Sequence, residues 1–227
     1  MTWPPRRETF VGAGDFKESG TMDASPIAIS EMERDALAEL ANIGVNRAAA
    51  TLRQMVGEQI LLSIPTVTIV PREIAAQFVQ ENSEPKLVAV QQSFDGSFSG
   101  KALLIFPQTR SLEIVRSILG GKHSFDDIVT MEHEVLAEAG NIILNAFLGT
   151  IANVLGQTLR MSLPSVIRGN GATLFDDRNV GDLALVLYID FIAKDRNIRG
   201  FIVLLMNLPA IANLKAIVQD FTKSVDQ

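Results

Sequence analysis

The chain contains an internal duplication, and this repeat limits the folds that it can adopt. When residues 35–67 are laid over residues 134–166, eleven of the thirty-three aligned positions are identical. The segments that follow align at an offset near 100, which matches Gly100 to Gly200. Two copies are too few for a solenoid. We therefore expect the copies to pack as one pseudo-twofold domain that shares a continuous sheet.

The first copy predicts a defined order of elements. Ser30 and Glu33 have the spacing of a capping box, and a helical pattern runs from there to Gly57. The next strand is interrupted at Pro65, because proline cannot donate to a strand ladder. The sequence then predicts a short helix (71–80), two strands (86–94 and 98–106) joined through Asp95-Gly96, and a helix from Pro107 to Gly120.

The second copy predicts the same order about one hundred residues later. It has a helix over about 130–155, a strand over about 158–167 broken at Pro164, two strands over about 183–193 and 198–207, and a helix from near Pro209. The predicted fold class is α+β, an α/β sandwich. Its duplicated helix-strand-hairpin-helix units form one mostly antiparallel six-stranded sheet flanked by helices. We place this single domain at residues 29–227, with repeats over about 30–122 and 129–222.

Composition excludes several classes of function. The 227 residues include no Cys and two His, and they carry a formal net charge of −6. Thiol nucleophiles and cysteine-ligated metals are therefore excluded, and two His leave little material for a histidine metal site or a catalytic triad. The acidic balance argues against nucleic-acid binding. The apolar runs are far shorter than the roughly 20 residues that span a bilayer. We expect a soluble cytoplasmic protein with no membrane partner.

Residues 1–28 mix proline, glycine and charge without any period. Such a segment cannot bury enough apolar surface to offset the entropy of ordering it, so we expect a flexible N-terminal tail. The alternative is a short docking peptide around Trp3 or residues 10–16.

A polar stripe lies on the long helix of each copy. At about 100° per residue, four positions fall within a sector of roughly 60° on one face. In the first copy these are Asp35, Glu39, Asn42 and Asn46, and in the second they are Glu134, Glu138, Asn141 and Asn145. An ordinary solvated face is the simpler explanation. However, asparagine is a poor residue inside a helix, and neither stripe has the Glu–Lys pairs that favour exposed charge.

The spacing in each stripe resembles the phosphatase signature of the CheC/CheX/FliY proteins of bacterial chemotaxis. That signature has Asp or Ser, then Glu, Asn and Pro, at the intervals Asp35-x₃-Glu39-x₂-Asn42-x₂₂-Pro65. The second copy keeps the intervals as Glu134-x₃-Glu138-x₂-Asn141-x₂₂-Pro164, with Glu in the first position. The resemblance covers roughly residues 30–222. Two copies in one chain resemble CheC more than CheX, which has one.

The resemblance implies an enzyme that hydrolyses the aspartyl phosphate of a CheY-like response regulator. In that family the Glu pairs with a lysine of the partner, and the Asn positions the attacking water. These roles fall on Glu39 and Asn42, and on Glu138 and Asn141. The Mg²⁺ belongs to the partner, so we expect no cofactor or metal of the chain's own. Asp35 and Glu134 flank the sites, and Pro65 and Pro164 are structural. Because Glu134 departs from the signature, the second copy is the weaker match and the two sites should be unequal.

Two other functions fit the same resemblance. One is a non-catalytic docking module of the flagellar switch, related in fold to the middle domain of FliM. That function predicts eroded stripes, whereas both Glu–Asn pairs are intact. The other is a regulator of the receptor deamidase CheD, which CheC proteins bind, and this role is compatible with phosphatase activity. No residue in the sequence locates a CheD surface.

Overall fold

The computed structural model describes residues 30–56, 60–64, 67–119, 123–177, 181–193 and 196–225. The tail predicted over residues 1–28 lies outside these residues, as do Gly57, Pro65 and Gly120. In chain order the elements are α1 (Glu31–Val56), β1 (Ile60–Ser63), β2 (Val67–Pro71), α2 (Arg72–Glu81), β3 (Leu87–Gly96), β4 (Gly100–Pro107), α3 (Gln108–Ile118), α4 (Phe125–Val154), β5 (Leu159–Met161), β6 (Ser165–Gly169), α5 (Gly171–Leu174), β7 (Leu183–Ala193), β8 (Arg196–Met206) and α6 (Leu208–Val225).

The predicted α+β fold is confirmed. Strands from both repeats form one sheet in the order β1-β7-β8-β4-β3-β5, with β2 also paired to β7 and β6 also paired to β3. All of these pairs are antiparallel. The sheet has eight strands rather than six because each interrupted strand forms two. Pro164 lies between β5 and β6, as the sequence predicts.

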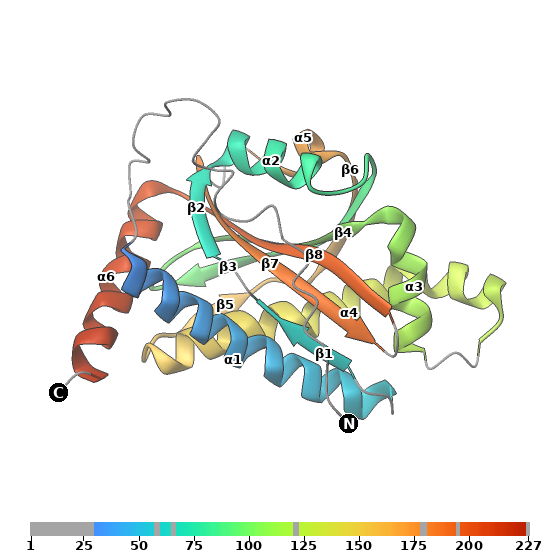
Figure 1. Ribbon diagram of the computed structural model, residues 1–227, viewed down its shortest axis with the longest axis horizontal. Helices are drawn as coiled ribbons and strands as arrows, with labels where there is room; N and C mark the ends of the chain where they lie inside the picture. The colour runs from blue at the N-terminus through green and yellow to red at the C-terminus, as the bar shows by residue number, and fades with distance from the viewer. Residues whose placement is uncertain are drawn as a thin grey trace, which may run out of the picture.

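The pseudo-twofold relation is visible at the centre of the sheet. Strands β4 and β8 pair there, and Leu103 lies opposite Val203, one hundred residues later. Helices α1 and α4 pack against each other and against one face of the sheet, while α2 and α5 cover the other face (Figure 1). Helix α3 packs on α4, and α6 packs on α1.

Three local features differ from the sequence prediction. Helix α4 begins at Phe125, about five residues early, because Ser124 and Asp127 form a capping box before it. The four-residue helix α5 was not predicted, and it begins at an Asn170 cap. Helix α4 is also long and apolar enough, by composition alone, to cross a membrane. More than half of its most apolar stretch is buried inside the protein, as in the core helix of a globular domain.

The two long helices approach each other closely at Gly44. A Cβ atom added at Gly44 would lie 2.8 Å from the Cα of Phe147 in α4. Real Cβ atoms essentially never come this near to another backbone, so a larger residue would force the helices apart. By contrast, a Cβ added at Gly149 of α4 would meet no atom of the described residues within 4 Å, apart from the adjacent backbone of its own helix.

We expect Gly44→Ala to lower the free energy of unfolding by about 1–3 kcal/mol, since the two backbones must separate. As the matched control, Gly149→Ala should raise it by about 0.5–1 kcal/mol, because alanine favours the helix and fills open space. Urea unfolding followed by circular dichroism measures both changes. Equal effects of the two substitutions would contradict the close helix contact.

Candidate functional site

The predicted carboxylates lie on the surface. Glu39 on α1 and Glu138 on α4 are exposed, and so are Asp35 and Glu134 one turn earlier. None of the four makes a hydrogen bond or ion pair with another residue in the described part of the chain. Each stripe therefore presents carboxylates to the solvent, where they are available to a cation on another molecule.

The amide of Asn42 is bound to its own chain. Its Nδ2 donates to the carbonyl oxygens of Ala38 (3.0 Å) and Ile64 (2.9 Å), and its Oδ1 accepts from the backbone N–H of Ile64 (2.8 Å). Ile64 has 2% of its surface exposed. An amide group has two hydrogens to donate, and both are used. Asn42 therefore fixes the end of β1 against α1 and has no free donor.

The amide of Asn141 has a different environment. Its Oδ1 accepts from Nε2 of Gln92 on β3 (3.0 Å) and from Nδ2 of Asn145, one turn later on α4 (2.7 Å). Its Nδ2 donates to none of the described residues, and the side chain is half-buried. The oxygen end of this amide is thus fixed inside the protein, and the donor end remains available.

Close packing of α4 on β3 makes this contact possible. A Cβ added at Gly140 would lie 2.5 Å from the side chain of Val90, so glycine is required at that point of the helix. Asn141 is the next residue, and Gln92 follows Val90 by two positions on the same face of β3. The glycine therefore brings the two amides within hydrogen-bond distance.

The residues that precede the two prolines, Ile64 and Leu163, differ in their burial and hydrogen bonding. Leu163, which corresponds to Ile64, is 90% exposed. The preceding residue, Ser162, is held on β3: its N–H donates to the carbonyl of Ser93 (2.9 Å), and its Oγ accepts from the N–H of Ser93 (2.9 Å). In the second unit, then, this loop is attached to the sheet and not to the asparagine.

Gln92 was missed by the sequence analysis. Strand alternation puts it on the same face as Val88, Val90 and Phe94, which belong to the core beneath α1 and α4. A glutamine at a core-facing position was the available signal, because buried polar side chains are rare and need partners.

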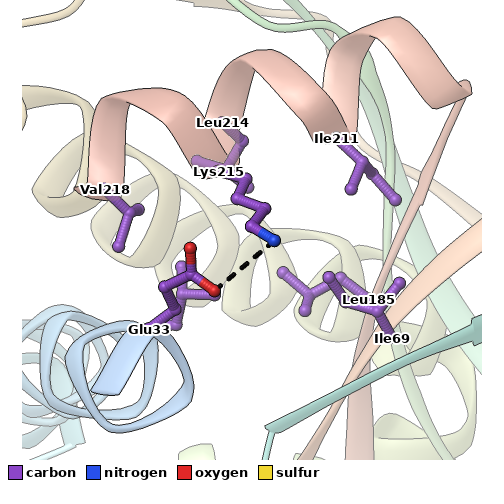
Figure 2. A pocket seen from close by; sticks show the side chains of 8 residues that line it. Glu33, Ile69, Leu185, Ile211, Leu214, Lys215 and Val218 are labelled. Carbon is purple, nitrogen blue, oxygen red and sulfur yellow. Dashed lines mark ion pairs between the residues drawn. The ribbon is translucent and has the colours of Figure 1, made fainter. Parts of the chain in front are cut away.

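Two cavities in the described part of the chain lie away from the stripes. One cavity, with a volume of ≈ 10 Å³, lies between α1, α6 and the sheet and has mostly apolar walls. Figure 2 shows its lining side chains, among which Glu33 and Lys215 form an ion pair. Their charged atoms are 3.7 Å apart. The cavity holds about one water molecule, so we assign no ligand to it. Burial raises the pKa of Glu33, but hydrogen bonds from Ser30 and Gln219 and the charge of Lys215 outweigh it and hold this pKa below its usual value.

A larger groove of ≈ 430 Å³ lies between α2 and α5, over the opposite face of the sheet, and it includes no residue of either stripe. Within the described residues, no group of three or more His, Asp and Glu side chains is placed to hold a metal ion. The two stripes are therefore the candidate sites.

Comparison with known proteins identifies relatives of the chain. The family profile described as chemotaxis phosphatase CheX matches residues 88–187. The flagellar motor switch phosphatase FliY of Bacillus subtilis is 26% identical over 140 residues, which are 61% of this chain and 36% of FliY. The CheC1 protein of Halobacterium salinarum is 25% identical over 183 residues, or 78% of this chain and 91% of CheC1. The CheY-P phosphatase CheC of B. subtilis is 23% identical over 141 residues, covering 61% of this chain and 67% of CheC.

The chain is thus similar to proteins named CheC, CheX and FliY. Solved structures share its fold. FliY of Thermotoga maritima superposes with a TM-score of 0.67 at 19% identity, covering 87% of this chain and 99% of the other. The middle domain of FliM from Vibrio alginolyticus gives a TM-score of 0.59 at 11% identity, covering 80% and 99%. At these identities the structural likeness shows the fold alone.

The site residues assigned from the family signature remain predictions, and the geometry ranks them. The sequence makes the second copy the weaker match because of Glu134. The hydrogen bonds favour the second copy instead, since only Asn141 keeps a free donor next to an exposed carboxylate. Pro65 of the first copy lies outside the described residues, and Pro164 is half-buried at the end of the Ser162–Leu163 loop.

We expect Asn42→Ala to lower the free energy of unfolding by about 1–3 kcal/mol, because the buried N–H and C=O of Ile64 lose their partner. Asn46→Ala is the matched control on the same helix: Asn46 is exposed, and its removal should change stability by no more than about 0.5 kcal/mol. Thermal unfolding measures both variants. A stability loss confined to Asn46→Ala would overturn this role of Asn42.

Proposed function

We propose that the chain hydrolyses the aspartyl phosphate of a CheY-like response regulator, and that Glu138 and Asn141 carry most of this activity. The relatives named FliY and CheC are described as phosphatases, and CheC as one that acts on phosphorylated CheY. The observation that carries the proposal is the free Nδ2 of Asn141, held one helical turn from the exposed Glu138.

The chemistry requires little from the protein beyond placement. An acyl phosphate is already activated, and phosphoryl transfer depends mainly on in-line positioning of the nucleophile and on charge stabilisation. The oxygen of water bonds to phosphorus while the bond from phosphorus to the aspartyl oxygen breaks. The products are inorganic phosphate and the restored carboxylate, and a proton of the water passes to the solvent.

Each residue has a role in this reaction. The Nδ2 of Asn141 donates to an oxygen of the attacking water or of the phosphoryl group, and the outward-facing end of the amide can act only as a donor. The carboxylate of Glu138 binds the lysine of the partner and so places the helix over the phosphoryl group. The Mg²⁺ that neutralises the phosphate would be held by the partner, as the resemblance to the chemotaxis phosphatases implies.

The first copy is poorly arranged for the same step. Asn42 can donate to a water only after it releases Ile64, and that release leaves two buried backbone groups without partners. We therefore assign Glu39 and Asn42 a minor share of the reaction. An exposed Glu39 next to a fully bonded Asn42 fits docking better than hydrolysis, as in a switch-type module.

We expect Asn141→Ala to lower the rate of phosphate release from a phosphorylated response regulator by about 100-fold, because the water loses its orientation. Asn42→Ala should retain most of the rate when activity is expressed per folded molecule. The measurement is phosphate release with excess response regulator and Mg²⁺.

The control substrate is a small phosphomonoester, which the chain alone should not hydrolyse because the partner supplies the pocket. Rapid hydrolysis of that ester would count against the proposal. So would an Asn141→Ala variant with the rate of the wild type. If Asn42→Ala were the more damaging substitution, the assignment of the second site would be wrong.

A further inference from the structure

Gln92 is one of the few buried polar residues in the described part of the chain, with 1% of its surface exposed. Its Nε2 donates both to Oδ1 of Asn141 (3.0 Å) and to the carbonyl oxygen of Ser162 (2.9 Å). It therefore joins three elements: strand β3, helix α4 and the loop after β5. Glu138 and Asn141 act on another molecule in the proposed function, whereas Gln92 is inside and cannot.

The backbone carbonyl of Ser162 sets the orientation of the side-chain amides of Gln92 and Asn141. A backbone carbonyl only accepts hydrogen bonds, so the amide nitrogen of Gln92 must face Ser162. The same nitrogen also donates to Asn141, so Asn141 must present its oxygen as the acceptor. The amide of Asn145 donates to the same oxygen, 2.7 Å away. The oxygen of Asn141 therefore faces inward and its NH₂ group faces outward, because the carbonyl of Ser162 fixes the orientation of the Gln92 amide.

The first unit has no glutamine at the equivalent position of its strand. Leu62 pairs with Phe191, and its counterpart Met161 pairs with Phe94, so Phe94 and Phe191 are equivalent positions. By this pairing, next to the asparagines, Gln92 is equivalent to Ile189, whereas the alignment of Gly100 with Gly200 matches it to Leu187; both residues are buried and apolar. The unit with a fully bonded asparagine has isoleucine at this position, and the unit with a free donor has glutamine.

The glutamine is not explained by stability. Its Oε1 is buried and accepts no hydrogen bond from the described residues. A buried acceptor without a partner destabilises the folded state, whereas an apolar residue of similar shape avoids that cost. Isoleucine at the equivalent position shows that the fold itself accepts an apolar side chain there.

We propose that Gln92 is a positioning residue for the reaction, which sets the amide of Asn141 with its N–H₂ group toward the partner. This inference rests on the proposed function, since it assigns a task to Asn141. Gln92 touches neither the phosphoryl group nor the water. It acts through Asn141, and it also fixes the Ser162 end of the loop beside the site.

The test compares Gln92→Leu and Gln92→Met with Ile189→Leu, the matched substitution at the equivalent position of the other unit. Both Gln92 variants remove the donor and keep an unbranched or similar shape. We expect them to lower kcat by about tenfold with KM unchanged, because orientation is lost while the docking surface is retained. Ile189→Leu should leave both parameters unchanged. A rise in KM without a change in kcat would overturn a positioning role.

A second measurement does not depend on activity. The side-chain amide signals of Asn141 can be assigned in a ¹H–¹⁵N NMR spectrum by their disappearance in Asn141→Ala. We expect them to shift and broaden in both Gln92 variants and to stay in place in Ile189→Leu. Unchanged Asn141 signals in the folded Gln92 variants would overturn the inference. A wild-type chain that releases no phosphate, but shows these shifts, would instead refute the proposed function and leave the positioning contact established.

Discussion

The candidate site depends on how closely helix α4 lies on strand β3. Gly140 leaves room for Val90 at this crossing, and any side chain there would raise the helix from the sheet. Asn141 and Gln92 would then be too far apart for their 3.0 Å hydrogen bond. A packing constraint in the core thus determines how a surface side chain is oriented, which is possible because protein interiors are close-packed and transmit displacement.

Duplication has given the two units the same order of elements and different polar contacts. Asn42 and Asn141 occupy equivalent positions on the long core helices α1 and α4. Asn42 meets the backbone of Ile64 and satisfies it, so the residue serves the fold. Asn141 meets a second side chain, Gln92, which uses only its oxygen. Equivalent sequence motifs therefore do not imply equivalent chemistry, and the difference lies in which backbone or side chain reaches the amide.

Much of this structure follows from the sequence alone. Three features predicted from the sequence are present in the structure: the repeated order of elements, the strand interrupted at Pro164 and the capping box at Ser30. The periodicity of α1 and α4 also places Glu39 and Glu138 on the surface. The direction in which an amide faces does not follow from such sequence features, because it depends on contacts between residues about twenty to seventy positions apart. Gln92 carries a usable signal, a polar residue on a core-facing strand position, but its partner cannot be read from that signal.

Because of the negative net charge, association with an acidic partner would depend on short-range contacts and their geometry. With a formal net charge of −6, the chain would gain no long-range attraction toward the proposed response regulator, whose phosphorylation pocket we expect to be acidic. Association then has to rely on contacts made at short range. A donor fixed in advance loses little conformational entropy when it engages an oxygen of the partner, and it needs no reorganisation during the reaction. In the proposed function, the hydrogen bonds from Ser162 through Gln92 to Asn141 supply that fixed donor, and they leave Oε1 of Gln92 without a partner among the described residues.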